Sequence, residues 1–212
     1  MLYLYGKIKA VMKKVIRKIK GSDQLFQALL IVFSVFLAFF ITEWRNTIND
    51  KKELNYVLTA LEQEIQINKE ILEKLIPYHD TVRNNFAIAF QNDSILKLMK
   101  IGPQIDYGVL MQNGILQNIA MSSAWETAKN SNKLTSINHT KLQALTKVYL
   151  QQDLTFSPVW EILDLLHSRE ALDSTKIEEN LIMFRKQFSD LRGREIRLLQ
   201  YYNEALKVLS EG

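Results

Sequence analysis

The chain has 212 residues, and its balance of 47% hydrophobic and 24% charged residues argues against wholesale disorder. It contains no cysteine, which excludes a disulfide framework, thiolate zinc sites and a catalytic thiol. The net charge of +4 is uneven, because residues 1–20 hold seven Lys or Arg and no acid, whereas residues 43–212 sum to −2. A nucleic-acid-binding domain normally spreads its basic surface over the fold, so this distribution argues against one.

Residues 1–21 form a basic arm. Apolar residues recur in it at helical spacing and the lysines fill the opposite face, as in helices that lie in a membrane interface. We expect this amphipathic cytoplasmic arm to end at Gly21 and to bind anionic headgroups. The side chains expected at the membrane surface are Lys13, Lys14, Arg17, Lys18 and Lys20.

Residues 22–44 contain the apolar stretch LFQALLIVFSVFLAFFITEW. Its uncharged part, 24–42, is long enough as a helix to cover roughly 28 Å, close to the thickness of a bilayer core. A buried core helix would show one polar face, and this stretch is apolar on every side. A cleaved signal peptide would have a shorter apolar region and a small-x-small site, which are absent here. We therefore predict an uncleaved transmembrane signal-anchor helix.

The distribution of Lys and Arg predicts the orientation of this span. Seven basic residues precede it and few follow it, so the positive-inside rule places the N-terminus in the cytoplasm. Trp44 stands where an interfacial aromatic anchor is expected. Residues 45–212 would then form an extracytoplasmic domain, periplasmic if the membrane is a bacterial inner membrane.

The extracytoplasmic domain begins with a heptad pattern that stops just before Pro77. We interpret this face as an interaction seam, in which a buried Asn68 can set register or strand number. The alternative is that Asn68 faces a neighbouring helix or water inside a bundle. The seam residues are Leu54, Leu58, Leu61, Ile65, Asn68, Leu72 and Leu75.

A second heptad pattern runs from Ile177 to Leu209 and is interrupted only by Glu195. Thr175 and Glu178 match a capping box at its start. The two patterned helices can pair antiparallel within one chain, or each can serve a self-associating partner. Periodicity does not separate these two arrangements.

The middle of the chain is predicted to be helical except at 101–115, where Pro103 and three glycines indicate irregular structure. We expect helices at 78–100 and 138–149, a helix opened by a capping box of Ser123 and Glu126, and a helix starting at Ser157 and Pro158. The predicted fold class is therefore all-α, with a single-pass transmembrane helix followed by a helical bundle whose first and last helices are long.

The segment 121–152 carries a resemblance to a known group of proteins. Its AWETAK-like run, together with the basic arm and the span ending in Trp44, resembles small bacterial membrane-anchored helical proteins classed as a domain of unknown function. The resemblance implies a single-pass helical envelope protein and supplies no functional residues. The matching positions are Ala124, Trp125, Glu126, Lys129, Ser131, Leu134, Leu142, Leu145, Tyr149 and Gln152.

Candidate chemistry is sparse. His79 and Asp80 can pair as base and orienter but lack an activated nucleophile. Asp164 and His167 form one carboxylate-x-x-His motif, whereas metal sites in helical bundles use two such motifs. We therefore interpret these two residues as part of a solvent-exposed helix face. Trp125, Tyr149 and Trp160 are expected in the core rather than in a ligand pocket. We predict no catalytic, metal-binding or cofactor-binding residue.

These patterns predict a non-enzymatic single-pass membrane protein whose helical domain mediates protein–protein interaction, as a scaffold or as an accessory subunit of a membrane complex. The expected partners are the lipid bilayer and either further copies of the chain or other subunits, and not nucleic acid. The alternative is a sensor-like bundle that binds a small ligand. It would have to signal through a partner, because only about 24 residues would lie in the cytoplasm.

Overall fold

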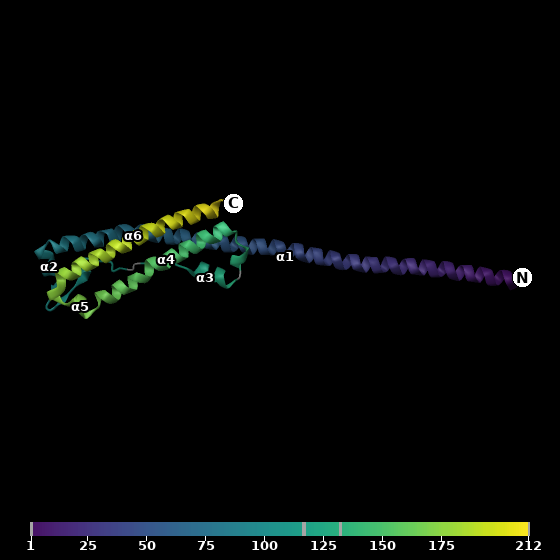
Figure 1. The fold of residues 1–212 in the computed structure, drawn as a ribbon, viewed down its shortest axis with the longest axis horizontal. Helices are drawn as coiled ribbons and strands as arrows, with labels where there is room; N and C mark the ends of the chain where they lie inside the picture. The colour runs from purple at the N-terminus through teal and green to yellow at the C-terminus, as the bar shows by residue number, and fades with distance from the viewer. Residues whose placement is uncertain (1, 116–117, 132, 212) are drawn as a thin grey trace. The chain divides into compact units, whose positions relative to one another are not determined.

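The computed structural model describes residues 2–115, 118–131 and 133–211, and in the first helix it describes the side chains of Lys13, Gln24 and everything from Phe26 onward. The chain is all-α and divides into two compact units, residues 1–53 and residues 54–212. The first helix, α1 (Leu2–Phe90), contributes to both units (Figure 1). It continues through Gly21, so the predicted break there is wrong; a glycine costs a helix only about 1 kcal/mol.

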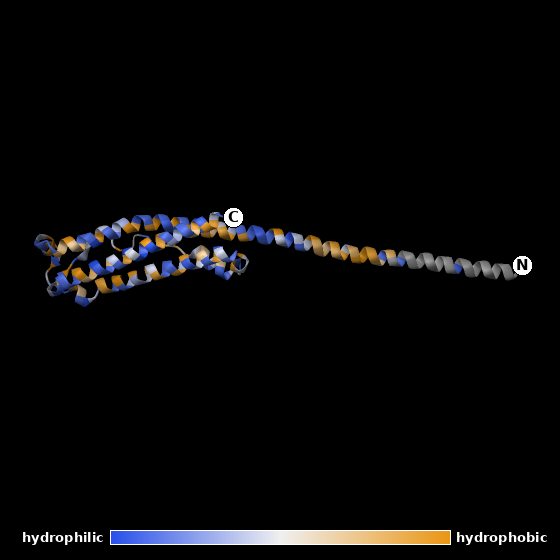
Figure 2. Ribbon diagram, turned by 45° about the horizontal axis from the view of Figure 1, so that its top comes forward, coloured by the Kyte–Doolittle hydropathy of each residue, from blue (hydrophilic) through white to orange (hydrophobic). Residues whose placement is uncertain are grey.

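The first unit contains the apolar stretch, which is orange in Figure 2. Its apolar side chains are exposed, from Phe26 at 65% to Ile41 at 51%, and α1 is the one described helix that is long and apolar enough to cross a membrane. The hydroxyl groups of Ser34 and Thr42 donate to the carbonyl oxygens four residues earlier, at 2.7 and 2.8 Å. Ser34 and Thr42 carry the two hydroxyl groups of the apolar stretch, and these bonds give both groups a hydrogen-bond partner where no water is needed.

The second unit is built around three long helices that run side by side in Figures 1 and 2: residues 54–90 of α1, α4 (His139–Leu166) and α6 (Ile177–Ser210). Both heptad patterns are buried between them. The first core cluster joins α1, α4 and α6 through Leu61, Ile65, Leu72, Leu145, Val148, Leu198, Tyr202, Ala205 and Leu209, among others. The second core cluster includes Val82, Phe86, Val159, Ile162, Leu181, Phe184 and Phe188, and Phe156 packs against both.

The heptad pattern of α1 continues beyond Pro77, contrary to the prediction that it stops there. His79, Val82, Phe86 and Ala89 extend the buried seam to the end of α1. Phe86 stacks on Phe188 of α6 at 5.6 Å between ring centroids, and His79, seven residues earlier, contacts Glu195, seven residues later. The two heptad helices therefore pair antiparallel and in register within the second unit.

Short elements complete the second unit. They are α2 (Asp93–Met99), β1 (Lys100–Ile101), β2 (Gln104–Ile105), η1 (Tyr107–Val109), α3 (Ser123–Asn130), η2 (Lys133–Ser136), α5 (Arg169–Leu172) and η3 (Ser174–Lys176). β1 and β2 pair antiparallel, and Gly102 turns between them with a φ of 61° that favours glycine. The predicted irregular stretch 101–115 is thus largely confirmed.

One predicted helix start and two predicted capping boxes are wrong. α4 continues through Ser157 and Pro158 as a single helix. α6 begins at Ile177, within two residues of Thr175, but without a side-chain cap, because the Thr175 hydroxyl donates to the Asp173 carboxylate at 2.7 Å. α3 begins at Ser123, which therefore lies in the helix rather than at its cap.

Candidate functional site

The second unit buries polar side chains at positions where its helices face one another. Glu195, Asn68 and His79 are at most 1% exposed, and Glu64 and Gln152 are 5% exposed. Burying such groups is costly unless each finds a hydrogen-bond partner. Their partners lie mainly in the described residues 110–115 and 118–125, which comprise the connector between η1 and α3 and the first turn of α3.

Asn68 binds the connector backbone as a strand neighbour would. Its side-chain oxygen accepts from the Met121 N–H at 2.7 Å, and its amide donates to the Met121 carbonyl oxygen at 2.6 Å. Gln152 of α4 donates to the same carbonyl at 3.0 Å and accepts from the Tyr202 hydroxyl at 2.7 Å. Asn68 therefore faces neighbouring elements of its own bundle, which was the alternative interpretation of its place in the heptad pattern.

Glu64 caps α3 from another helix. The N-cap residue Ser122 makes no side-chain cap bond, and the Glu64 carboxylate accepts instead from the Ala124 N–H at 2.7 Å and the Trp125 N–H at 3.3 Å. A carboxylate is favoured there by the positive end of the helix dipole. Glu64 also accepts from the Tyr149 hydroxyl at 2.7 Å. Burial first, and then the bond to Glu64, raise the pKa of Tyr149 far above its ordinary value.

His79 joins α6 to the connector. Its Nδ1 lies 2.6 Å from Glu195 Oε1 and its Nε2 lies 3.0 Å from the Ile115 carbonyl oxygen. Both partners are acceptors, so both ring nitrogens donate and the imidazolium form fits the geometry. Burial lowers the pKa of His79, but the Glu195 carboxylate and the Ile115 carbonyl outweigh it and raise the pKa above 6.5. Glu195 Oε2 is buried without a hydrogen-bond partner.

Together these contacts fasten the connector to α1. Asn85 donates to the Leu110 carbonyl at 3.0 Å, and Tyr78 donates to the Gly114 carbonyl at 2.5 Å. His79, Asn68 and Glu64 continue this series of contacts. Residues later in the connector bind residues earlier in α1, so the connector runs antiparallel to α1. The buried polar side chains thus supply hydrogen bonds to backbone groups in residues 110–115 and 118–122, where the described part of the connector forms no helix or strand.

The histidines do not assemble the predicted candidate chemistry. His79 pairs with Glu195 rather than with Asp80, which forms ion pairs with Arg83 and Arg192 at 3.0 and 2.9 Å. α4 ends at Leu166, so Glu170 belongs to α5 and does not continue a helical series from Asp164. Within the described residues, no group of three His, Asp or Glu side chains could hold a metal ion.

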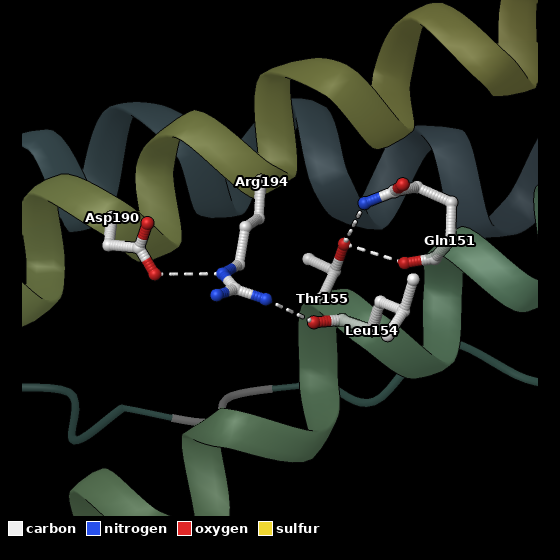
Figure 3. A network of polar contacts seen from close by, with 5 residues as sticks. All are labelled: Gln151, Leu154, Thr155, Asp190 and Arg194. Carbon is white, nitrogen blue, oxygen red and sulfur yellow. Dashed lines mark hydrogen bonds and ion pairs between the residues drawn. The ribbon is translucent and has the colours of Figure 1, made fainter.

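A groove open to solvent lies between α4 and α6 beside Pro158. Proline has no N–H and cannot bond the carbonyl four residues earlier, which belongs to Leu154. Arg194 of α6 donates to that carbonyl at 3.0 Å and to the Asp190 carboxylate at 2.8 Å, as Figure 3 shows. On the same turn Thr155 donates to the Gln151 carbonyl at 2.7 Å. Arg194 therefore replaces the bond that Pro158 removes.

The groove consists of two adjoining hollows. One, of about 510 Å³, is lined by Pro158, Glu161, Ile162, Met183, Lys186, Gln187, Asp190, Leu191 and Arg194. The other, of about 410 Å³, shares Asp190 and Arg194 with it and extends to Leu154, Gly193 and Arg197. The outer face of α4 exposes Leu150 at 59%, Leu154 at 50% and Trp160 at 57%, and of these Leu154 lines the second hollow.

The predicted aromatic core is confirmed in part. Trp125 stacks on Tyr149 with ring centroids 4.8 Å apart, and both are buried. Trp160 is exposed, so the expectation that it lies in the core is wrong. The spacing of α4 places Trp160 near Ser157 and Asp164, which are also exposed, and away from the buried Val159 and Ile162.

The predicted site residues fall into three groups. Lys13 and Trp44 are exposed, and the side chains of Lys14, Arg17, Lys18 and Lys20 lie outside the described part of α1. Of the heptad seam, Leu54 and Leu58 are half-buried. The other five, Leu61, Ile65, Asn68, Leu72 and Leu75, are buried inside the chain's own bundle. Sequence reasoning did not single out Glu64, whose role depends entirely on its distant partners.

No family model, curated protein or solved structure matches this chain. The function is therefore argued from the chain's own residues. In the segment 121–152, Tyr149 and Gln152 join the buried hydrogen bonds and Trp125 stacks on Tyr149, which gives these three residue types a structural role.

Replacing Pro158 with alanine is expected to stabilise the second unit by about 1–2 kcal/mol, because it restores a helical hydrogen bond and removes the cost of an interior proline. Chemical unfolding followed by circular dichroism measures this change. The same change in the Arg194→Ala background should stabilise more, because the Leu154 carbonyl lacks its Arg194 partner there. A loss of stability in P158A would show that α4 needs its proline for packing.

Proposed function

We propose that this is a non-enzymatic single-pass membrane protein whose helical unit, residues 54–212, mediates protein–protein contacts outside the cytoplasm. It acts as a scaffold or as an accessory subunit of a membrane complex. The apolar stretch of α1 anchors it, and the basic arm of residues 1–21 rests on anionic headgroups on the cytoplasmic side. In a bacterium this places the helical unit in the periplasm.

The observation that carries the proposal is the outer face of α4. Leu150, Leu154 and Trp160 are at least half exposed there, and Leu154 lines one hollow of the open groove, while the facing sides of α1, α4 and α6 are buried in the bundle core. Several exposed apolar side chains on the outer side of one helix mark a contact surface more often than scattered single ones do. The buried polar side chains, by contrast, are engaged with backbone and side-chain groups of the same unit, which favours contact over chemistry.

A surface variant tests the contact. In a mild detergent, full-length protein is expected to co-migrate with a second polypeptide, and a triple variant, Leu150→Ser with Leu154→Ser and Trp160→Ser, is expected to migrate alone. A control with Ile67→Ser, Leu98→Ser and Ile101→Ser, which are also exposed, should keep the complex. A wild-type protein that always migrates as a lone monomer would overturn the proposal.

The orientation has its own test, because the chain has no native cysteine. A membrane-impermeant maleimide applied to intact cells should label a Gln66→Cys variant and leave a Lys13→Cys variant unlabelled until the cells are lysed. The reverse pattern would place the helical unit in the cytoplasm.

A further inference from the structure

We propose that the partner of the helical unit is an acidic amphipathic polypeptide segment that lies along the exposed ridge of α6 and inserts apolar side chains beside α4. The ridge is formed by Ile182, Arg185, Lys186, Ser189, Gly193 and Arg197, all exposed. This inference rests on the proposed function and adds the chemistry of the partner.

The ridge is rich in basic side chains. Arg185, Lys186 and Arg197 form no ion pair with the residues that the structure describes, whereas Arg194 is paired with Asp190 and Arg192 with Asp80. A third hollow, of about 370 Å³, lies on the α1 side of the ridge and adds Arg83 to Arg185 and Lys186 without any acidic lining residue. The basic excess therefore lies on the ridge itself and on its α1 flank, whereas the α4 flank also carries Glu161 and Asp190. Complementarity to the ridge favours an acidic partner.

The hollows beside the ridge combine apolar and basic side chains. Ile182 lines the α1-side hollow and is 56% exposed, and Leu154 lines the α4-side hollow and is 50% exposed. A purely anionic polymer or a lipid headgroup would gain nothing from these side chains. An amphipathic polypeptide would bury its apolar side on them and present carboxylates to the arginines.

The ridge contains a glycine, Gly193, in the interior of α6. Glycine is among the least favourable residues in a helix interior, and α6 runs 34 residues through this one. A β-carbon built at Gly193 would meet no atom within 4 Å, so packing inside the chain does not require glycine there. A glycine beside Ser189 does allow another chain to approach the helix backbone closely. Residues 182–197 span roughly 22 Å, enough for about four turns of a partner helix.

The test uses full-length protein in its native membrane with a photo-crosslinking amino acid at Ser189. The expected product is a crosslink to a polypeptide segment with net negative charge. Reversing Arg185, Lys186 and Arg197 to Glu should reduce it by at least about tenfold, and lysines placed in the crosslinked segment should restore it. A control triple, Lys74→Glu with Lys97→Glu and Lys147→Glu, has the same charge change and should leave the crosslink intact.

The Gly193→Ala variant separates a lost contact from a damaged fold, because it should weaken the crosslink while making the protein more stable. It should raise the midpoint of thermal unfolding by about 2–4 °C and at the same time weaken the Ser189 crosslink. A crosslink to a neutral or basic segment, to lipid or to a second copy of this chain, or no crosslink, would overturn the inference. If a photo-crosslinking residue at position 154 still captures another polypeptide, the proposed function stands although the inference about the α6 ridge fails. If the probes at positions 189 and 154 both capture nothing, the inference and the proposed function are both wrong.

Discussion

Replacing His79 with alanine is expected to lower the free energy of unfolding of the helical unit by about 3–5 kcal/mol, because it leaves the buried Glu195 carboxylate without the hydrogen-bond partner that it has among the described residues. The Ile115 carbonyl loses its partner as well. Chemical unfolding of full-length protein in detergent, followed by circular dichroism, measures the loss.

Two controls separate the buried pair from histidine in general. His167→Ala, at an exposed position, should change stability by less than about 0.5 kcal/mol. The double variant His79→Leu with Glu195→Leu removes both charges and should recover much of the loss, since apolar pairs often replace buried ion pairs without cost. A cost below about 1 kcal/mol for His79→Ala would contradict the pairing.

The same pair predicts a pH dependence. The pKa of His79 is raised above its ordinary value of 6.5, because the Glu195 carboxylate and the Ile115 carbonyl outweigh the effect of burial. The folded protein therefore holds this proton more tightly than the unfolded chain, so the stabilising contribution is complete below pH 6.5 and is lost as pH rises through the raised pKa. The stability difference between wild type and the double leucine variant should fall over that interval. A difference that grows with pH would contradict it.

Glu64→Ala is expected to be nearly as damaging, with a loss of about 2–4 kcal/mol. It removes the acceptor for the α3 backbone N–H groups of Ala124 and Trp125 and for the Tyr149 hydroxyl. The rings of Trp125 and Tyr149, which stack on each other, then lose the contacts that hold them in place. The fluorescence of Trp125 should report the change together with the unfolding curve. Glu62→Ala, exposed on the same helix, is the matched control, and an equal effect in both variants would contradict the capping role.

The sequence predicted the long helices well because the apolar spacing of α1 and α6 decides which faces are buried. It also marked Asn68 and Glu195 as polar interruptions in otherwise apolar seams. The partner of Glu195 could have been found, since the antiparallel register that stacks Phe86 on Phe188 also places His79 beside Glu195. The partners of Asn68 could not, because Met121 lies in a connector without periodicity.

The groove was beyond sequence reasoning for two physical reasons. Ser157 and Pro158 carry a strong local signal for a helix start, and a contact from Arg194, 40 residues away from Leu154, overrides it. α4 also has leucines on both of its faces, so its periodicity does not reveal that Leu150 and Leu154 lie outside.

The outer face of α4 is the surface that we propose contacts another polypeptide in the membrane-anchored protein. Site-specific photo-crosslinking from position 154 in native membranes tests it most directly, with the exposed Gln66 of α1 as the control position. We predict a crosslinked polypeptide from position 154 and none from position 66. No product from position 154, or equal products from both positions, would contradict the account.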